Sequence, residues 1–352
     1  MLKSNASPID FSSNDYLGFA RSKILKEEVE ILLNNNPNYF LGSTGSRLLS
    51  GNSKFCEELE DTIAQFHHAN SGLLFNSGYD ANIGLLSCIA QRGDTIITDE
   101  LIHASLIDGA RLSYANKYIF KHNDLNSLED KLKNSKGNIF IVTESVFSMD
   151  GDLAPLKEIA ALAEKYKANL IVDEAHATGV LGAYGAGLVS HLNLENDVFA
   201  RIHTFGKAIG IHGAIILGSQ ELKTYLTNFA RSFIYTTALP YHTLAGIKVA
   251  YENLRKTEAI DKLKENIVYF KENSEKLNHI LISSKSAIQC LLIPGNDKCK
   301  SVSNHLQSKG FEVKPILSPT VAEGGERLRI CLHAYNTKEE IQNLIFEISK
   351  MI

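Results

Sequence analysis

The stretch NIFIVTESVFSMDGDLAPLKEIAALAEKYKANLIVDEAH, residues 138–176, decides the fold class. It begins with a short apolar run rich in β-branched residues, 138–145, and ends with a second such run, 169–176. Between the two runs lies Pro155, which suits the first position of a helix, followed by apolar residues at helical spacing: Leu156, Ile159, Ala160, Ala163 and Tyr166. This order predicts two parallel strands joined by a helix that covers one face of their sheet.

Further apolar runs extend the pattern on both sides of this stretch, at 71–76, 94–99, 117–122, 201–205 and 213–218. We therefore predict an α/β fold with a mostly parallel seven-stranded sheet wrapped by helices. A sheet of this kind normally binds its ligand beyond the carboxyl ends of its strands. Polar clusters follow the predicted strands at 76–79, 144–152, 173–176 and 203–207.

The pattern changes towards the carboxyl end of the chain. Residues 240–283 have helical spacing, and the rest combines short apolar runs with two helical segments. We predict a short amino-terminal segment (1–40), a large domain (41–239), and a linking helix with a small α+β domain (240–352).

The composition limits the possible partners. The chain has 352 residues, and 36 Lys and Arg against 40 Asp and Glu give a formal net charge of −4, which disfavours nucleic acid and anionic membranes as partners. No run of about 18 apolar residues and no signal peptide are apparent, so a cytoplasmic protein is expected. The five cysteines lack metal-ligand spacing and are expected to be reduced and buried: Cys56, Cys88, Cys290, Cys299 and Cys331.

Lys207 is the most informative single residue. It lies in TFGKAIG (204–210), directly after a predicted strand, and Gly206 leaves room beside it. A lysine at the mouth of a parallel sheet can lose hydration and become a Schiff-base nucleophile. An ordinary surface lysine remains the alternative.

Asp173 ends a predicted buried strand, where a carboxylate needs a cationic partner. The protonated ring of pyridoxal phosphate is such a partner, and His176 could then contact its 3-hydroxyl. Asp173 could instead cap the next turn, or DEAH could mark a nucleic-acid-dependent NTPase. The NTPase requires a phosphate loop, G-x-x-x-x-G-K-[ST], whereas Ala208 follows Gly206-Lys207 and Ile202 occupies the first glycine position.

Other candidates are weaker when taken singly. His103 could stack on a flat ring or cap a helix, and Gly78 and Tyr79 open a predicted helix whose free N–H groups could bind a phosphate. Ser148 offers a hydroxyl. The loop GSTGSRLLSGN (42–52) contains Ser46 and Arg47.

Two further pairs lie in the later part of the chain. Thr236 and Thr237 could donate to a phosphate or satisfy a turn. Arg327 and Arg329 alternate along a predicted strand and so lie on one face of it, where one of them could bind a substrate carboxylate. A solvated strand face is the alternative.

The motifs taken together resemble a known family. In order, they are FSSNDYLG (11–18), GSTGSRLLSGN, FNSGYDAN, HASLIDGAR, TESVFSMDGDLAPL, VDEAHATGVLG, TFGKAIG and IYTTALP. This set is similar to the α-oxoamine synthases, pyridoxal-phosphate enzymes with the aspartate-aminotransferase-like fold. The resemblance covers almost the whole chain.

The resemblance implies a role for each matching residue. Lys207 would form the Schiff base with the cofactor, Asp173 would pair with its pyridine nitrogen and His103 would stack on its ring. The other implied cofactor contacts are Gly78, Tyr79, Ser148, His176, Thr204, Thr236 and Thr237, and the implied substrate positions are Asn14, Ser46, Thr320 and Arg329.

The resemblance also implies an activity: decarboxylative condensation of L-alanine with a pimeloyl thioester in biotin biosynthesis, by a cytoplasmic homodimer in which Thr236 or Thr237 reaches the neighbouring subunit's phosphate. Glycine C-acetyltransferase, another α-oxoamine synthase and a non-catalytic cofactor-binding protein remain alternatives. Leu317 stands where an arginine is expected, and an amino-terminal arginine is also missing. The acyl chain and its carrier, coenzyme A or acyl carrier protein, therefore stay open, and Arg329 is expected to lead anion recognition.

Overall fold

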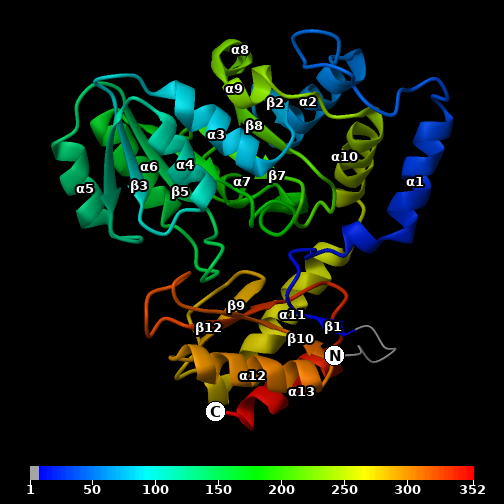
Figure 1. Ribbon diagram of the computed structural model, residues 1–352, viewed down its shortest axis with the longest axis vertical. Helices are drawn as coiled ribbons and strands as arrows, with labels where there is room; N and C mark the ends of the chain where they lie inside the picture. Colours follow the sequence, from blue (N-terminus) through cyan, green and yellow to red (C-terminus); the bar gives the residue numbers. More distant parts are fainter. Residues whose placement is uncertain (1–7) are drawn as a thin grey trace. The chain divides into compact units, whose positions relative to one another are not determined.

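The structure is a computed structural model that describes residues 8–352 (Figure 1). The chain divides into two compact units. Unit 1 contains the residues up to Gly18, Ser148–Leu153 and Thr257–Ile352, and unit 2 contains Phe19–Phe147 and Ala154–Lys256.

Unit 2 is built on a seven-stranded sheet with the order β2-β8-β7-β6-β5-β3-β4. Strand β8 runs antiparallel to both of its neighbours, and the other six strands share one direction. The strands are β2 (Ser71–Phe75), β3 (Thr95–Asp99), β4 (Asn116–Phe120), β5 (Ile139–Glu144), β6 (Asn169–Asp173), β7 (Ala200–Thr204) and β8 (Ala214–Gly218). The predicted α/β fold with a mostly parallel sheet is confirmed, and each predicted strand is present.

Continuous apolar runs form these strands because both faces of the sheet are covered. Every residue of β2, β3 and β5 is buried, whereas edge strand β4 is exposed except at Phe120. Helices lie on both faces (Figure 1). The strands are followed by α3 (Gly78–Ile89), α4 (Ala104–Leu112), α5 (Leu125–Lys133), α6 (Leu156–Tyr166), α7 (Leu188–His191) and α8 (Gln220–Phe229).

Side-chain caps set where several of these helices begin. Ser77 Oγ accepts from Asp80 N ahead of α3, and His103 Nδ1 accepts from Ser105 N ahead of α4. Each cap satisfies an N–H group that has no partner within the first helical turn. Pro155, predicted as the first helical residue, lies one position earlier, before α6.

Unit 2 has four further α-helices, α1 (Lys23–Asn34), α2 (Lys54–Phe66), α9 (Arg231–Ile234) and α10 (Tyr241–Leu254). Of these, α1 and α10 lie outside residues 41–239. Helix α1 packs against α10, and α2 packs against strand β2. Because of this packing, residues 19–40 and 240–256 belong to unit 2.

Unit 1 is an α+β unit. Its antiparallel sheet has the order β11-β12-β9, and β1 pairs in parallel with β10. The elements are β1 (Ile9–Asp10), α11 (Ala259–Asn273), β9 (Ile288–Leu292), α12 (Asn296–Ser308), β10 (Phe311–Glu312), β11 (Lys314–Ile316), β12 (Arg327–Cys331) and α13 (Lys338–Ser349).

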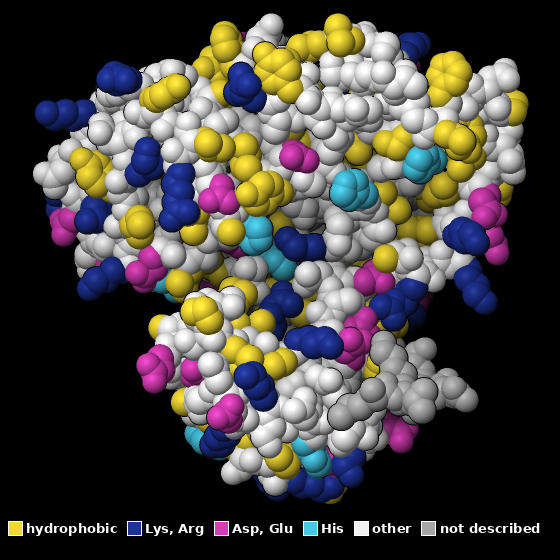
Figure 2. All heavy atoms as spheres, viewed as in Figure 1, with side chains coloured by type: hydrophobic (Ala, Val, Ile, Leu, Met, Phe, Trp, Pro, Cys, Tyr) yellow, Lys and Arg dark blue, Asp and Glu magenta, His cyan; other side chains and the backbone are white. Residues whose placement is uncertain are grey.

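The distribution of surface charge and the burial of the cysteines are as expected from the composition. Basic and acidic side chains are interspersed on the face shown in Figure 2. All five cysteines are buried and unpaired, as predicted. Within residues 8–352, no helix is both long enough and apolar enough to cross a bilayer.

Candidate active site

The carboxyl ends of three neighbouring strands place several predicted site residues at one edge of the unit 2 sheet. In the strand register, Glu144 of β5 lies beside Asp173 of β6, and Asp173 lies beside Ile202 of β7. Thr204 ends β7 two residues later, and Lys207 follows in the next turn. Because β5, β6 and β7 are parallel, these residues meet at the edge where ligands of such sheets bind.

The Asp173 carboxylate is held at both of its oxygens. Asp173 is 4% exposed, its Oδ1 accepts from Ala175 N at 2.9 Å, and its Oδ2 accepts from Asn82 Nδ2 at 2.8 Å. A buried carboxylate with two fixed donors keeps one orientation, and it remains suited to a cationic partner.

His103 caps helix α4, so the capping interpretation of this residue is correct. Its backbone N–H donates to the carboxylate of Glu144. Burial lowers the pKa of the His103 imidazole; the charge of Asp173 raises this pKa and that of Lys207 lowers it. Asp173 and Lys207 therefore both lie within electrostatic reach of His103.

Lys207 lies in the tight connection between β7 and β8. Ile211 N donates to Phe205 O at 2.9 Å, and Gly210 N donates to Lys207 O at 2.9 Å. Gly210 has a φ of 72°, which a side chain would disfavour. A Cβ built on Gly206 would meet no atom within 4 Å, so there is open space next to the half-buried lysine, as predicted.

Helix α3 begins at Gly78, as predicted, and its first turn offers a cradle for an anion. Ser77 satisfies Asp80 N and Ala81 N, and no other described residue accepts from Gly78 N or Tyr79 N. A Cβ on Gly78 would lie 2.4 Å from Thr204 Cγ2, so only glycine allows this approach. The Thr204 hydroxyl is buried and has no partner within the described residues. Two free N–H groups and an orphaned hydroxyl fit a phosphate.

These groups fit the cofactor that the sequence implied. Pyridoxal phosphate needs a carboxylate for its ring nitrogen, a primary amine for its aldehyde and donors for its phosphate. Asp173, Lys207 and the start of α3 supply these groups, and all belong to unit 2. His176 is buried in the turn after β6.

The glycine-rich loop lies beside the two predicted threonines. Asn76 Nδ2 donates to Thr236 Oγ1 and to Thr237 O, both at 2.9 Å. Ala238 N donates to Gly45 O at 3.0 Å. Ser46 contributes its carbonyl to the turn, where it accepts from Gly51 N at 2.9 Å.

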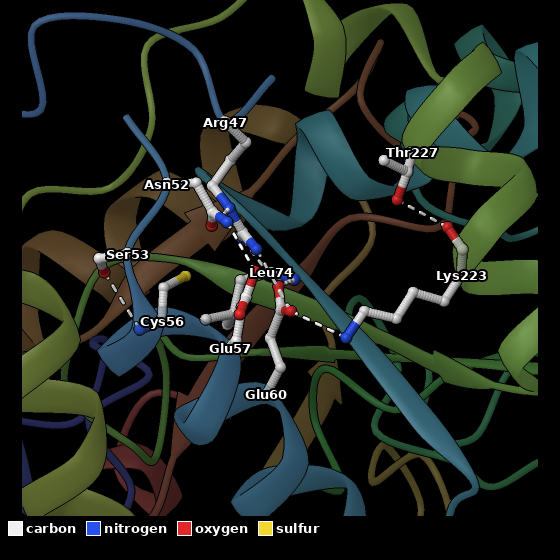
Figure 3. Close-up of polar contacts among 9 residues, drawn as sticks. All are labelled: Arg47, Asn52, Ser53, Cys56, Glu57, Glu60, Leu74, Lys223 and Thr227. Carbon is white, nitrogen blue, oxygen red and sulfur yellow. Dashed lines mark hydrogen bonds and ion pairs between the residues drawn. The ribbon is translucent and has the colours of Figure 1, made fainter. Parts of the chain in front are cut away.

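Figure 3 shows an ionic cluster that the sequence did not indicate. Glu60 of α2 is fully buried and accepts from Arg47 Nη1 at 2.7 Å, from Leu74 N at 2.9 Å and from Lys223 Nζ at 3.0 Å. The cluster joins the glycine-rich loop to β2, the strand that leads into the phosphate cradle. Glu60 escaped prediction because it lies among exposed acidic residues in EELED.

In unit 1, the two arginines of β12 have different partners. Arg327 forms an ion pair with Asp150. Arg329 donates from Nε to Ser148 O at 2.7 Å and from Nη2 to Asn14 Oδ1 at 3.0 Å. Among the described residues, no carboxylate pairs with Arg329, so its charge is the one available to an anion.

Three predicted residues of unit 1 can now be placed. Asn14 and Ser148 both contact Arg329, Ser148 through its backbone carbonyl. Thr320 is exposed in the loop between β11 and β12, which also contains Leu317. Three buried residues near the sheet edge lie within the quoted motifs but had no role assigned from the sequence: Asn82, Ser105 and Glu144.

The chain matches the family model of aminotransferase class I and II over residues 6–348. The chain belongs to the aminotransferase class I and II family. An 8-amino-7-oxononanoate synthase of Emericella nidulans is 45% identical to this family member over 367 residues, which cover 98% of this chain and 89% of the relative. One from Alkaliphilus oremlandii is 40% identical, covering 97% and 87%.

Solved structures of this family give the same result. An 8-amino-7-oxononanoate synthase from Francisella tularensis matches at 31% identity with a TM-score of 0.83, covering 98% of this chain and 97% of that one. Serine palmitoyltransferase from S. paucimobilis, with bound PLP-myriocin aldimine, matches at 26% identity with a TM-score of 0.92, covering 98% and 87%. The predicted resemblance to α-oxoamine synthases and the predicted fold are confirmed, and the chain is an acyltransferase-type enzyme.

Proposed function

We propose that this enzyme is an 8-amino-7-oxononanoate synthase, which condenses L-alanine with a pimeloyl thioester and releases carbon dioxide and the thiol carrier. The observation that carries this proposal is the near-full-length match to relatives with that activity, at 45% and 40% identity. The arrangement of His103, Asp173 and Lys207 supports it, because the reaction needs a base beside an acidified α carbon.

Pyridoxal phosphate, when bound, supplies an electron sink for the negative charge that develops at the α carbon of the amino acid. Asp173 would hold the ring nitrogen, and Gly78 N, Tyr79 N and the Thr204 hydroxyl would hold the phosphate. His103 would cover the ring. The Lys207 amine would attach the cofactor and then hold the α proton that the substrate loses.

Arg329 would bind a substrate carboxylate. Its guanidinium is oriented by Ser148 O and Asn14 Oδ1, and Tyr16 OH donates to the same Asn14 oxygen at 3.1 Å. A guanidinium held in one orientation loses little entropy on binding an anion. Leu317 leaves the identity of the acyl carrier, coenzyme A or acyl carrier protein, to be established by assay.

A homodimer would cover the apolar residues around the glycine-rich loop. Phe40, Leu41 and Leu49 are 80%, 81% and 84% exposed, and Tyr235 is 73% exposed next to Thr236. Large apolar side chains that are this exposed are typical of interfaces. This supports the proposal that Thr236 or Thr237 serves the neighbouring subunit's phosphate.

Steady-state turnover with a panel of amino acids and thioesters tests the proposed function. We expect L-alanine with pimeloyl-CoA or pimeloyl acyl carrier protein to give the highest kcat/KM and to release carbon dioxide. Preference for glycine with acetyl-CoA would instead assign glycine C-acetyltransferase and overturn the proposal.

A further inference from the structure

A buried hydrogen-bond chain connects His103 to Asp173 through two residues that have no role so far. Asn82 Nδ2 donates to Asp173 Oδ2 at 2.8 Å and to Ser105 Oγ at 2.9 Å. Ser105 Oγ lies 2.8 Å from His103 Nδ1. Asn82 and Ser105 are 2% and 1% exposed, so water does not compete for these bonds.

The Asp173 carboxylate determines the direction of the two hydrogen bonds that Asn82 makes. An ionised carboxylate can only accept, so the Asn82 nitrogen, and not its oxygen, must face Asp173. The Asn82 oxygen is buried and has no partner within the described residues. An orphaned oxygen is costly, so the two bonds made by the nitrogen must hold the amide in this orientation.

The remaining bonds then fix the state of His103. The Ser105 hydroxyl accepts from Asn82 and is free to donate to His103 Nδ1, and Ser105 N also donates to Nδ1 at 3.2 Å. A backbone N–H cannot accept, so Nδ1 carries no hydrogen and the ring hydrogen is on Nε2. Burial lowers the pKa of His103, which favours this neutral form.

We propose that Asn82 and Ser105 are positioning residues that orient the Asp173 carboxylate and hold His103 as its neutral Nε2–H tautomer. No described residue accepts from Nε2, which leaves this N–H as a donor for a carbonyl or carboxylate oxygen of the substrate. The inference deepens the proposed function and rests on it for the identity of that substrate.

The test uses the full chain loaded with 15N-labelled pyridoxal phosphate and 15N-labelled in histidine, studied by solid-state NMR. His103→Gln assigns the His103 signals by their loss. In the wild type we expect one protonated and one unprotonated nitrogen, with Nε2 protonated, and a protonated cofactor ring nitrogen. A hydrogen on His103 Nδ1 would overturn the inference.

Two near-isosteric variants separate the hydrogen bonds from simple packing. Asn82→Leu removes both donors, and Asn82→Asp places a second carboxylate against Asp173. We expect Asn82→Leu to weaken pyridoxal phosphate binding at least tenfold, and we expect both variants to shift the ring-nitrogen signal. Wild-type affinity and an unchanged signal in Asn82→Leu would show that Asn82 only fills space.

Ser105→Ala interrupts the hydrogen-bond chain between Asn82 and His103. It removes one of the two donors to Nδ1 and leaves the bond between Asn82 and Asp173 in place. We expect the Nδ1 signal to shift while the ring-nitrogen signal and the affinity for pyridoxal phosphate stay near wild type. An unchanged Nδ1 signal would show that Ser105 does not donate to His103 and would overturn this part of the proposal. None of these readouts involves turnover, so failure of the proposed function would be recognised separately, in the substrate panel.

Discussion

The guanidinium of Arg47 meets the buried carboxylate of Glu60 through two contacts, of 2.7 and 3.3 Å. The same carboxylate accepts from Leu74 N. Through this carboxylate, the glycine-rich loop is fixed to strand β2, which leads directly to the phosphate cradle at Gly78. The loop conformation therefore depends on one buried ion pair that is distant in sequence from Lys207.

Arg47→Ala should destabilise unit 2, because Glu60 would keep only Lys223 as a charged partner. Breaking a buried ion pair from one side typically costs about 3 kcal/mol or more, so we expect a loss of that size in urea unfolding at fixed protein concentration. The exposed pair of Lys54 and Glu58 is the matched control. Removing this exposed pair by Lys54→Ala should lower the free energy of unfolding by less than ~1 kcal/mol. If Arg47→Ala and Lys54→Ala lowered it equally, the pair of Arg47 and Glu60 would not stabilise unit 2 as a buried ion pair.

Gly78→Ala should weaken cofactor binding, because the new Cβ would lie 2.4 Å from Thr204 Cγ2. Overpacking of this kind costs ~1–3 kcal/mol, which corresponds to binding weaker by about 5- to 150-fold. Adding Thr204→Ser removes the clashing methyl group and keeps the hydroxyl, so the double variant should recover most of the affinity. Absorbance titration with pyridoxal phosphate measures both effects. If Thr204→Ser fails to rescue Gly78→Ala, the close approach is not the cause.

Arg329→Ala should weaken the binding of L-alanine by about 10- to 100-fold, since hydrogen bonds to charged groups contribute ~1.5–3 kcal/mol. The absorbance change of the loaded enzyme on adding L-alanine gives the dissociation constant. Arg327→Ala is the control, because Arg327 is already paired with Asp150. We expect the Arg327→Ala variant to bind L-alanine with near wild-type affinity. If Arg327→Ala weakened this binding more than Arg329→Ala, Arg327 and not Arg329 would be the residue that binds the substrate carboxylate.

Acid should destabilise unit 2 through His67. Burial, and then the charge of Arg201, lowers the pKa of His67 to about 3. The unfolded imidazole, with an ordinary pKa near 6.5, binds a proton that the folded one does not. Stability that is fully present above pH 6.5 is therefore lost as the pH falls towards 3, with a slope of up to ~1.4 kcal/mol per pH unit.

His67→Gln should reduce this slope, and unfolding measured from pH 7 to pH 4 checks it. The comparison with wild type separates His67 from Glu174. Burial raises the pKa of Glu174 to about 7, so its contribution to stability is lost in the opposite direction, as the pH rises from about 4.5 to 7. His191→Gln, at an exposed position, is the control. If the free energy of unfolding changed with pH at the same rate in wild type and in His67→Gln, His67 would not be the source of the acid sensitivity.

The sheet of unit 2 could be predicted because its strands are buried on both faces, which gives uninterrupted apolar runs such as 94–99. The ends of those strands then indicated Asp173 and Lys207. Strand β1 could not be predicted, since two residues carry no periodicity and it forms only by pairing with β10.

Contacts between residues that are distant in the sequence could not be predicted either. Asn82 and Asp173 are separated by 91 residues, and nothing in the local pattern of GYDAN shows that one amide will face that carboxylate. The resemblance already indicated Arg329 rather than Arg327, but the physical reason came from the structure, in which Arg327 is paired with Asp150. Sequence motifs indicated candidate residues for the chemistry, whereas folding determines how those residues are held.

The most direct test of the account is reduction of the loaded enzyme with borohydride, followed by peptide mapping. We expect a coloured protein in which reduction fixes the pyridoxyl group on the peptide containing Lys207, and a Lys207→Ala variant that binds the cofactor without becoming labelled. A protein that binds no pyridoxal phosphate, or a label fixed on any other lysine, would contradict the central claim.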